Sequence, residues 1–187
     1  MVERISALDG NYQKGIFGKG KTPGIQLIEV KDLILYQVAV WPNTLKNVGS
    51  NIAKSLSLEE YPEPNFASSN KINAMLRVEP LKWWVVGKSN LKEITTEESC
   101  ILDISHSKTC IRISGKDTIS FINRFLPIDL REISFPVDAV ASTVFHHVSV
   151  TLWRSKIGYE LFIPRAFALS LWELLKESAA QFGYEIQ

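Results

Sequence analysis

The feature that most constrains the fold of this 187-residue chain is a series of elements that occurs twice. In each half, a strand is followed by an amphipathic helix, a long loop, a second strand, a turn and a third strand. The first series covers residues 33–86 and the second covers residues 109–153. Strand–helix–strand–strand order favours antiparallel sheets with helices on one face. We therefore predict an α+β fold of two βαββ-type modules with mainly antiparallel sheets.

This pattern divides the chain into three segments. Residues 1–23 form an N-terminal arm, whose closely spaced glycines are expected to exclude regular structure. Residues 24–96 hold the first module and residues 97–187 hold the second. Because a chain of this length suits a single domain, we expect the two modules to share one compact domain.

Four apolar residues distinguish the arm from a solvated tail. They can pack on the core of this chain, which is the simpler expectation, or on another protein. A glycine-rich apolar segment gains order when it docks, so we take these residues as the candidate partner interface. They are Leu8, Tyr12, Ile16 and Phe17.

Alternating apolar residues and turn residues place the strands, and apolar residues with helical spacing place the helices. The expected strands are Gly24–Val30, Leu33–Val40, Ile72–Val78, Lys82–Val86, Cys100–Ile104, Thr109–Ser114, Val140–Phe145, Val148–Trp153 and Tyr159–Ile163, with Tyr184–Ile186 as a last edge strand. The expected helices run from Thr44 to Leu56, from Gly115 to Leu126 and from Arg165 to Phe182.

Each expected helix carries one apolar stripe. The stripes are Leu45, Val48, Ile52 and Leu56 in the first helix, Ile119, Ile122, Phe125 and Leu126 in the second, and Phe167, Leu171, Leu174 and Leu175 in the third. Trp83 and Trp84 are neighbours in one strand, so their rings must lie on opposite faces of the sheet. One ring belongs to the core, and the other needs cover from this chain or from another protein.

Composition excludes several classes of function. The net charge is +1 with both signs spread along the chain, so no basic face is expected and nucleic acid is a poor partner. No stretch approaches the ~20 apolar residues that a membrane-spanning helix needs. The first residues do not resemble a signal peptide, and we therefore expect a cytoplasmic protein without membrane contact.

The two cysteines, Cys100 and Cys110, form neither a disulfide framework nor the spacing of a metal cluster. We expect both of them to be small buried apolar residues in a reducing compartment.

Residues 15–22 satisfy the G-x-x-x-x-G-K-[ST] pattern of a phosphate-binding loop. Such a loop needs a buried strand before it and a helix after it, because the helix N-terminus holds the phosphates. Here no apolar strand precedes the pattern. Pro23 and Gly24 follow it and lead into a segment typical of a strand. We therefore expect no nucleotide site.

The histidines give no catalytic pattern. His146 and His147 are adjacent, in or beside a strand, so their side chains point to opposite faces. His106 follows Asp103 at a spacing that could orient an imidazole for acid–base chemistry. No nucleophile accompanies the pair, and a turn stabilised by hydrogen bonds from Asp103, Ser105 and His106 is the simpler interpretation.

Residues 100–182 resemble a known family. The segments Asp103–Thr109 and Ile111–Gly115 resemble the D-[LV]-S-H and I-x-[IL]-S-G stretch of the aminomethyltransferase superfamily. Several further segments are similar to the gamma subunits of heterotetrameric sarcosine oxidases in particular. These are Asn123–Leu130, Phe135–Pro136, Leu152–Arg154, Tyr159–Arg165 and Phe167–Glu173. The first half agrees more loosely, at Gly18–Leu27 and Val78–Gly87.

The resemblance implies a subunit of a complex with alpha, beta and delta partners. Such complexes demethylate sarcosine oxidatively to glycine, with hydrogen peroxide and methylenetetrahydrofolate as products. The family carries FAD, FMN, NAD, zinc and tetrahydrofolate on the other subunits. Transferases of the superfamily have a glycine-rich segment and an acidic pair near their folate. The corresponding region here, Val148–Ile163, has one glycine and no aspartate pair.

The sequence therefore predicts a non-catalytic gamma subunit that supports a sarcosine oxidase. On this hypothesis the chain itself contributes no catalytic, cofactor-binding or metal-binding residue. One alternative is a free-standing, folate-binding, one-carbon transferase-like protein of the same fold. Another is a small assembly factor that binds the oxidase only transiently.

Overall fold

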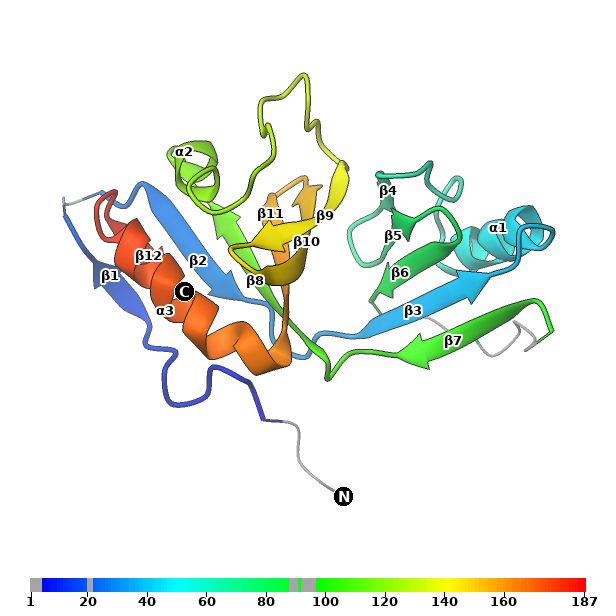
Figure 1. The fold of residues 1–187 in the computed structure, drawn as a ribbon, viewed down its shortest axis with the longest axis horizontal. Coiled ribbons are helices and arrows are strands. Elements are labelled where there is room, and N and C mark those ends of the chain that lie inside the picture. Colours follow the sequence, from blue (N-terminus) through cyan, green and yellow to red (C-terminus); the bar gives the residue numbers. More distant parts are fainter. Residues whose placement is uncertain (1–4, 20–21, 88–90, 92–96) are drawn as a thin grey trace. The chain divides into compact units, whose positions relative to one another are not determined.

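The computed structural model describes residues 5–19, 22–87, 91 and 97–187. The chain forms two compact units, each with its own sheet (Figure 1). The first unit comprises Met1–Lys31, Ser107–Val137 and Ser142–Gln187, and the second comprises Asp32–His106 and Asp138–Ala141. The architecture is α+β with mainly antiparallel sheets, as the order of elements predicts.

The second unit is a five-stranded sheet with one helix. Its strands lie in the order β4-β5-β6-β3-β7, and every neighbouring pair is antiparallel. The elements are β3 (Leu35–Val40), α1 (Leu45–Ser55), β4 (Ala67–Ser69), β5 (Ala74–Glu79), β6 (Lys82–Val86) and β7 (Ser99–Asp103). The apolar stripe of α1 packs on the sheet, and Val48, Ile52 and Leu56 are fully buried there, as predicted.

The adjacent tryptophans of β6 are both buried. Trp83 lies in the core between the sheet and α1, with its ring edge-to-face with Tyr61 at a centroid distance of 6.0 Å. Trp84 points to the opposite face and is only 7% exposed. Its Nε1 donates a hydrogen bond to the Gln37 side chain at 3.4 Å. The second ring is therefore covered by this chain itself, and it is not left for a partner.

Replacement of Trp83 by alanine is expected to lower the free energy of unfolding by about 3–5 kcal/mol, because a fully buried ring leaves a cavity. The matched control is Trp41→Ala. Trp41 is 59% exposed, so this change should stay within about 0.5 kcal/mol. Urea denaturation followed by far-UV circular dichroism measures both. Equal losses in the two variants would contradict the assigned core.

The first unit is a seven-stranded sheet in the order β1-β12-β2-β8-β11-β10-β9. Its strands are β1 (Gly15–Phe17), β2 (Ile25–Glu29), β8 (Lys108–Ser114), β9 (Val140–Phe145), β10 (Val148–Ser155), β11 (Gly158–Pro164) and β12 (Tyr184–Ile186). The helices are α2 (Thr118–Ile122), the 3₁₀ turn η1 (Arg165–Phe167) and α3 (Ala168–Ala179). Ile111 and Ile113 of β8 are fully buried, in agreement with the predicted alternation.

The helices of the first unit bury partly different residues from those expected. In α2, Phe121 is buried and Ile119 is 37% exposed, because the helix begins only at Thr118 and turns Thr118, Phe121 and Ile122 inward. In the last helix, Phe167 lies in η1 and is 49% exposed, and Leu174 is 37% exposed. The buried face of α3 consists of Ala168, Leu171, Trp172, Leu175 and Ala179.

The last strand, β12, is interior to the sheet, which corrects the expected edge position. It runs parallel to β2 and antiparallel to β1. β12 runs in the same direction as β11, and helix α3 connects the two strands. This is a βαβ connection. The arm then adds β1 outside β12, although its glycines argue against regular structure. Gly15–Phe17 can pair because β12 offers a free edge.

Relative to the two modules expected from the sequence, one strand of each joins the sheet of the other. β2 directly precedes β3 in the chain, but it pairs with β8 and β12 of the first unit. β7 directly precedes β8, but it pairs with β3 of the second unit. The unit boundaries consequently fall near residues 31 and 106, and they differ from the expected modules 24–96 and 97–187. Sequence order alone assigns each of these strands to the wrong sheet.

Candidate functional site

The arm packs mainly on its own unit. Leu8 is fully buried. Tyr12 stacks on Trp172 at a centroid distance of 5.5 Å, and Phe17 stacks on Tyr184 at 5.3 Å. Of the four predicted interface residues, Ile16 is the one that is largely exposed, at 60%.

Hydrogen bonds hold the arm in place. The Tyr12 hydroxyl donates to the backbone oxygen of Gln187 at 2.5 Å and accepts from the Glu29 backbone N–H at 3.0 Å. Trp172 Nε1 donates to the Asn11 carbonyl at 3.3 Å. Burial raises the pKa of Tyr12, so the hydroxyl remains a donor at neutral pH. The arm from Ile5 to Phe17 is therefore a structural part of the first unit.

The described part of the phosphate-loop pattern does not have the geometry of a phosphate site. Gly15–Phe17 forms β1, and Gly18 packs against the Ala180 backbone with φ of 82°. The element that follows the pattern is the strand β2 and not a helix. Gly20 and Lys21 lie outside the described residues.

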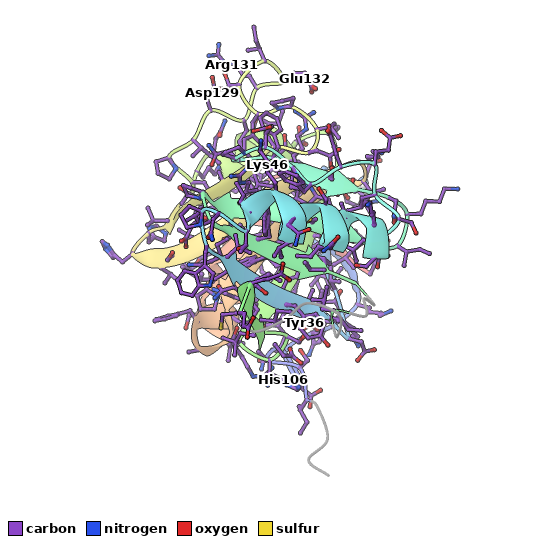
Figure 2. The ribbon with its side chains drawn as sticks, turned by 90° about the vertical axis from the view of Figure 1, so that its right-hand side faces the viewer. Tyr36, Lys46, His106, Asp129, Arg131 and Glu132 are labelled. Carbon is purple, nitrogen blue, oxygen red and sulfur yellow. The ribbon has the colours of Figure 1, made fainter. Side chains whose placement is uncertain are left out.

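The histidine segments form turns. The Asp103 carboxylate accepts a hydrogen bond from the Ser105 N–H at 2.9 Å, and the Ser105 hydroxyl binds the backbone of Leu35. His106 is exposed beside this turn (Figure 2). The turn interpretation is thus confirmed for Asp103 and Ser105. His146 and His147 form the turn between β9 and β10, and His146 has a positive φ of 53°.

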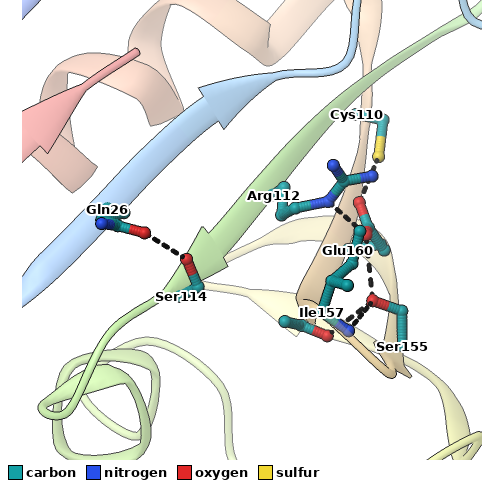
Figure 3. Close-up of polar contacts among 8 residues, drawn as sticks. Gln26, Cys110, Arg112, Ser114, Ser155, Ile157 and Glu160 are labelled. Atoms are coloured by element: carbon teal, nitrogen blue, oxygen red, sulfur yellow. Dashed lines mark hydrogen bonds and ion pairs between the residues drawn. The ribbon is translucent and has the colours of Figure 1, made fainter.

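Among the buried polar or charged residues described in the first unit, Glu160 on β11 has the smallest exposed fraction, 3% (Figure 3). Its Oε1 accepts from Arg112 Nε at 2.6 Å and from the Ser155 hydroxyl at 3.1 Å. Its Oε2 accepts from the Cys110 thiol at 3.6 Å. Arg112 lies opposite Glu160 in the β8–β11 register, so the pairing of the two strands places the two charges together. Both oxygens of the carboxylate are therefore engaged within the chain.

The neighbours of Cys110 make it a poor nucleophile. Complete burial, and then the charge of Glu160, raise the pKa of the thiol well above its ordinary value. The thiolate is the reactive form, so Cys110 stays protonated and inert at neutral pH. Cys100 is exposed, against the prediction that both cysteines are buried, because it lies on β7 at the edge of the second sheet.

The two cysteines are expected to react very differently with iodoacetamide. Cys100 should be alkylated in the native protein, and Cys110 should react at least about tenfold more slowly until urea unfolds the chain. Mass spectrometry of the intact protein measures this difference. Native Cys100→Ser serves as the control and should gain no adduct. Equal native rates for the two thiols would contradict the burial of Cys110.

A loop after α2 carries polar contacts that the sequence does not indicate. Asp129 and Arg131, labelled in Figure 2, form a bidentate ion pair with Nη2···Oδ2 at 2.7 Å. Hydrogen bonds from Arg131 and Ser134 hold the pKa of Asp129 well below its usual range. Arg154 anchors the loop by donating to the Phe135 carbonyl at 2.7 Å and pairing with Glu132. These are structural contacts within the chain.

Among the described residues, no group of three or more histidine, cysteine or acidic side chains could hold a metal ion. None of the described helices is long and apolar enough to cross a membrane.

Two solved structures resemble this chain. Heterotetrameric sarcosine oxidase from Corynebacterium sp. U-96, in complex with pyrrole 2-carboxylate, matches with a TM-score of 0.82 and 16% identity, over 96% of each chain. Glycine cleavage system aminomethyltransferase T from Bartonella henselae matches with a TM-score of 0.59 and 12% identity, over 88% of this chain and 48% of that one. The chain has the fold of these two proteins. No protein-family model and no curated protein matches it.

The two matches differ in extent. This chain spans about half of the aminomethyltransferase, but nearly the whole of the matched sarcosine oxidase chain. The fold class expected from the sequence resemblance is therefore confirmed.

Proposed function

We propose that this chain is a non-catalytic gamma-type subunit of a heterotetrameric sarcosine oxidase. The observation that carries the proposal is the structural match over 96% of both chains, with a TM-score of 0.82. A likeness of this extent, to a chain of nearly the same length, fits a corresponding subunit better than a fragment of a larger enzyme. The motifs of residues 100–182 support the same assignment.

In this proposal the alpha, beta and delta partners carry the chemistry in the cytoplasm. The complex demethylates sarcosine to glycine, with hydrogen peroxide and methylenetetrahydrofolate as products. We place FAD, FMN, NAD, zinc and tetrahydrofolate on those partners. The buried carboxylate Glu160, which could otherwise serve a ligand, is already bound by Arg112 and Ser155. This chain supplies structural support.

Co-expression with the alpha, beta and delta chains tests the proposal. The chain should co-purify in stoichiometric amount, and sarcosine oxidation should fall when it is omitted. If it stays outside the complex, and activity is the same without it, the proposal is wrong. A chain that binds substoichiometrically and is lost on size exclusion would instead indicate a transient assembly factor.

Ile16, the largely exposed member of the four predicted interface residues, offers a sharper variant. Ile16→Glu should weaken assembly if the arm contacts a partner, because it places a charge on an apolar contact. Ile157→Glu is the control, since Ile157 is 62% exposed on the β10–β11 turn of the same unit. If Ile16→Glu and Ile157→Glu assemble equally well, Ile16 of the arm does not contact a partner.

The likeness to aminomethyltransferase T over 88% of this chain favours a second candidate, a free-standing folate-binding protein related to one-carbon transferases. Titration of the isolated chain with tetrahydrofolate separates the two candidates. Saturable micromolar binding would support the second candidate, and its absence would leave the subunit role as the better account.

A further inference from the structure

A shallow depression of about 260 Å³ lies on the first unit, where the segment after α2 meets the turn between β9 and β10. Its lining residues are Asn123, Arg124, Phe125, Leu126, Pro127, Val144 and His146. The ring of Phe125 stacks on Phe145 at a centroid distance of 4.5 Å, and Leu126 is buried. The depression thus combines an apolar floor with two groups that can carry positive charge.

Arg124 is held in place entirely by uncharged groups. Its guanidinium lies over the ring of Phe182 at 4.5 Å, and Nη1 donates to the Gln181 side chain at 3.0 Å and to the Ser178 hydroxyl at 3.3 Å. It forms no ion pair with any carboxylate of the described residues. Arg112, Arg131 and Arg154 each pair with an acidic side chain, whereas Arg77 and Arg165 donate to backbone carbonyls. Arg124 is therefore an oriented guanidinium whose positive charge has no partner within the described chain.

His146 is also oriented. Its ring lies edge-to-face with Phe145 at a centroid distance of 5.4 Å and with Phe125 at 6.3 Å. The positive φ of 53° at His146 places it in a tight turn, so the ring is held at the rim by the backbone as well as by the aromatic contacts. An imidazole N–H at this rim can donate a second hydrogen bond to an acceptor bound by Arg124.

The volume of the depression and the charge of its lining residues indicate which class of ligand it can bind. Small-molecule and cofactor pockets usually enclose about 300–1,000 Å³, and this open depression is smaller. It suits one or two residues of a peptide better than a folate or a flavin. The hydrogen bonds of Arg124 use Nη1 alone, so Nε and Nη2 have no acceptor within the part of the chain that the structure describes. A guanidinium can bind a carboxylate through two parallel hydrogen bonds from such donors. The apolar floor matches an apolar side chain next to that carboxylate.

We propose that this depression binds a carboxylate-bearing apolar segment of a partner subunit. The carboxylate contacts Arg124 and His146, and the neighbouring apolar side chain covers Phe125 and Val144. The identity of the partner rests on the proposed function. The chemistry of the site rests only on the residues that line it.

The first test uses N-acetyl-L-phenylalanine as the probe and N-acetyl-L-phenylalaninamide as the control that lacks the carboxylate. In ¹H–¹⁵N spectra of the full chain, the acid should shift the resonances of Phe125, Val144 and His146 in a saturable manner. The amide should bind at least about tenfold more weakly, the factor that corresponds to the loss of about 1.4 kcal/mol. Equal binding of acid and amide, or shifts centred elsewhere, would overturn the proposal.

Variants connect the binding to Arg124. Arg124→Gln should weaken the acid about tenfold and leave the amide unchanged, whereas Arg124→Lys should recover only part of the affinity, because it keeps the charge without the planar fork. Lys156→Gln removes the same charge from an exposed position on the β10–β11 turn and should leave binding of the acid unchanged. A loss of the same size in Lys156→Gln would indicate attraction by net charge alone and would contradict the site.

The second test uses the complex. Arg124→Glu should enter the sarcosine oxidase complex less well than the wild type, and Lys156→Glu should enter normally. If both variants assemble as the wild type does, the depression does not bind a partner subunit, although the proposed function stands. If the wild type itself fails to assemble, the proposed function falls, and the probe titration still decides whether the depression is a carboxylate site.

Discussion

Residues 1–96 and residues 97–187, produced as separate fragments, are expected to be unfolded alone and to fold when they are combined. The cut falls between β6 and β7, and it divides the strands of each sheet between the two fragments. The first fragment loses β7, which pairs with β3. The second fragment loses β2, which pairs with β8 and β12, and β1, which pairs with β12. Each fragment therefore exposes a central strand whose backbone groups and apolar face have lost their partner.

Far-UV circular dichroism and size-exclusion chromatography of the single and mixed fragments test this expectation. A fragment of residues 32–106 is the matched control, because it contains all five strands of the second sheet. It should show a cooperative thermal transition of its own, whereas residues 24–96 should not. A cooperatively folded fragment 97–187 would show that the exchanged strands are not needed, and the assigned topology would then be wrong.

Replacement of Arg112 by methionine is expected to lower the free energy of unfolding by about 3 kcal/mol. The change leaves the Glu160 carboxylate buried at 3% exposure without its ion-pair partner. Breaking a buried pair in this way costs about 3–5 kcal/mol, and Arg112 is itself 28% exposed, which favours the lower end of the range. Urea denaturation measures the loss.

The double variant Arg112→Met, Glu160→Leu provides the control. It removes the unpaired charge together with its partner, so most of the lost stability should return. If the double variant is as unstable as Arg112→Met, the loss of stability comes from altered side-chain packing and not from the unpaired charge of Glu160. A loss of less than about 1 kcal/mol in Arg112→Met would show that water reaches Glu160 and that the pair is not buried in solution.

Local patterns were sufficient for most of the elements. The stripe of α1, the alternation in β8 and the turn at Asp103 and Ser105 depend on residues within a few positions of each other, and the structure has them as predicted. The long loop expected after the first helix is present, although the short strand β4 forms within it.

The pairing of distant segments could not be predicted in the same way. Arg112 and Glu160 each interrupt an apolar strand, which marks both as unusual, but only the register of β8 against β11 brings them together. The arm residues Tyr12 and Phe17 carry no indication of whether their partner is on this chain. In the structure their partners are on this chain: Tyr12 stacks on Trp172, and Phe17 stacks on Tyr184.

The sequence by itself determined the α+β class, the doubled series of elements and most strand positions, because hydrophobic periodicity and turn residues act over short distances. The tertiary structure alone decided which sheet β2 and β7 join, the interior position of β12 and the orientation of the Arg124 guanidinium, which has no ion-pair partner among the described side chains. A strand presents the same alternation to either sheet, and its choice depends on backbone pairing and burial between segments far apart in the chain.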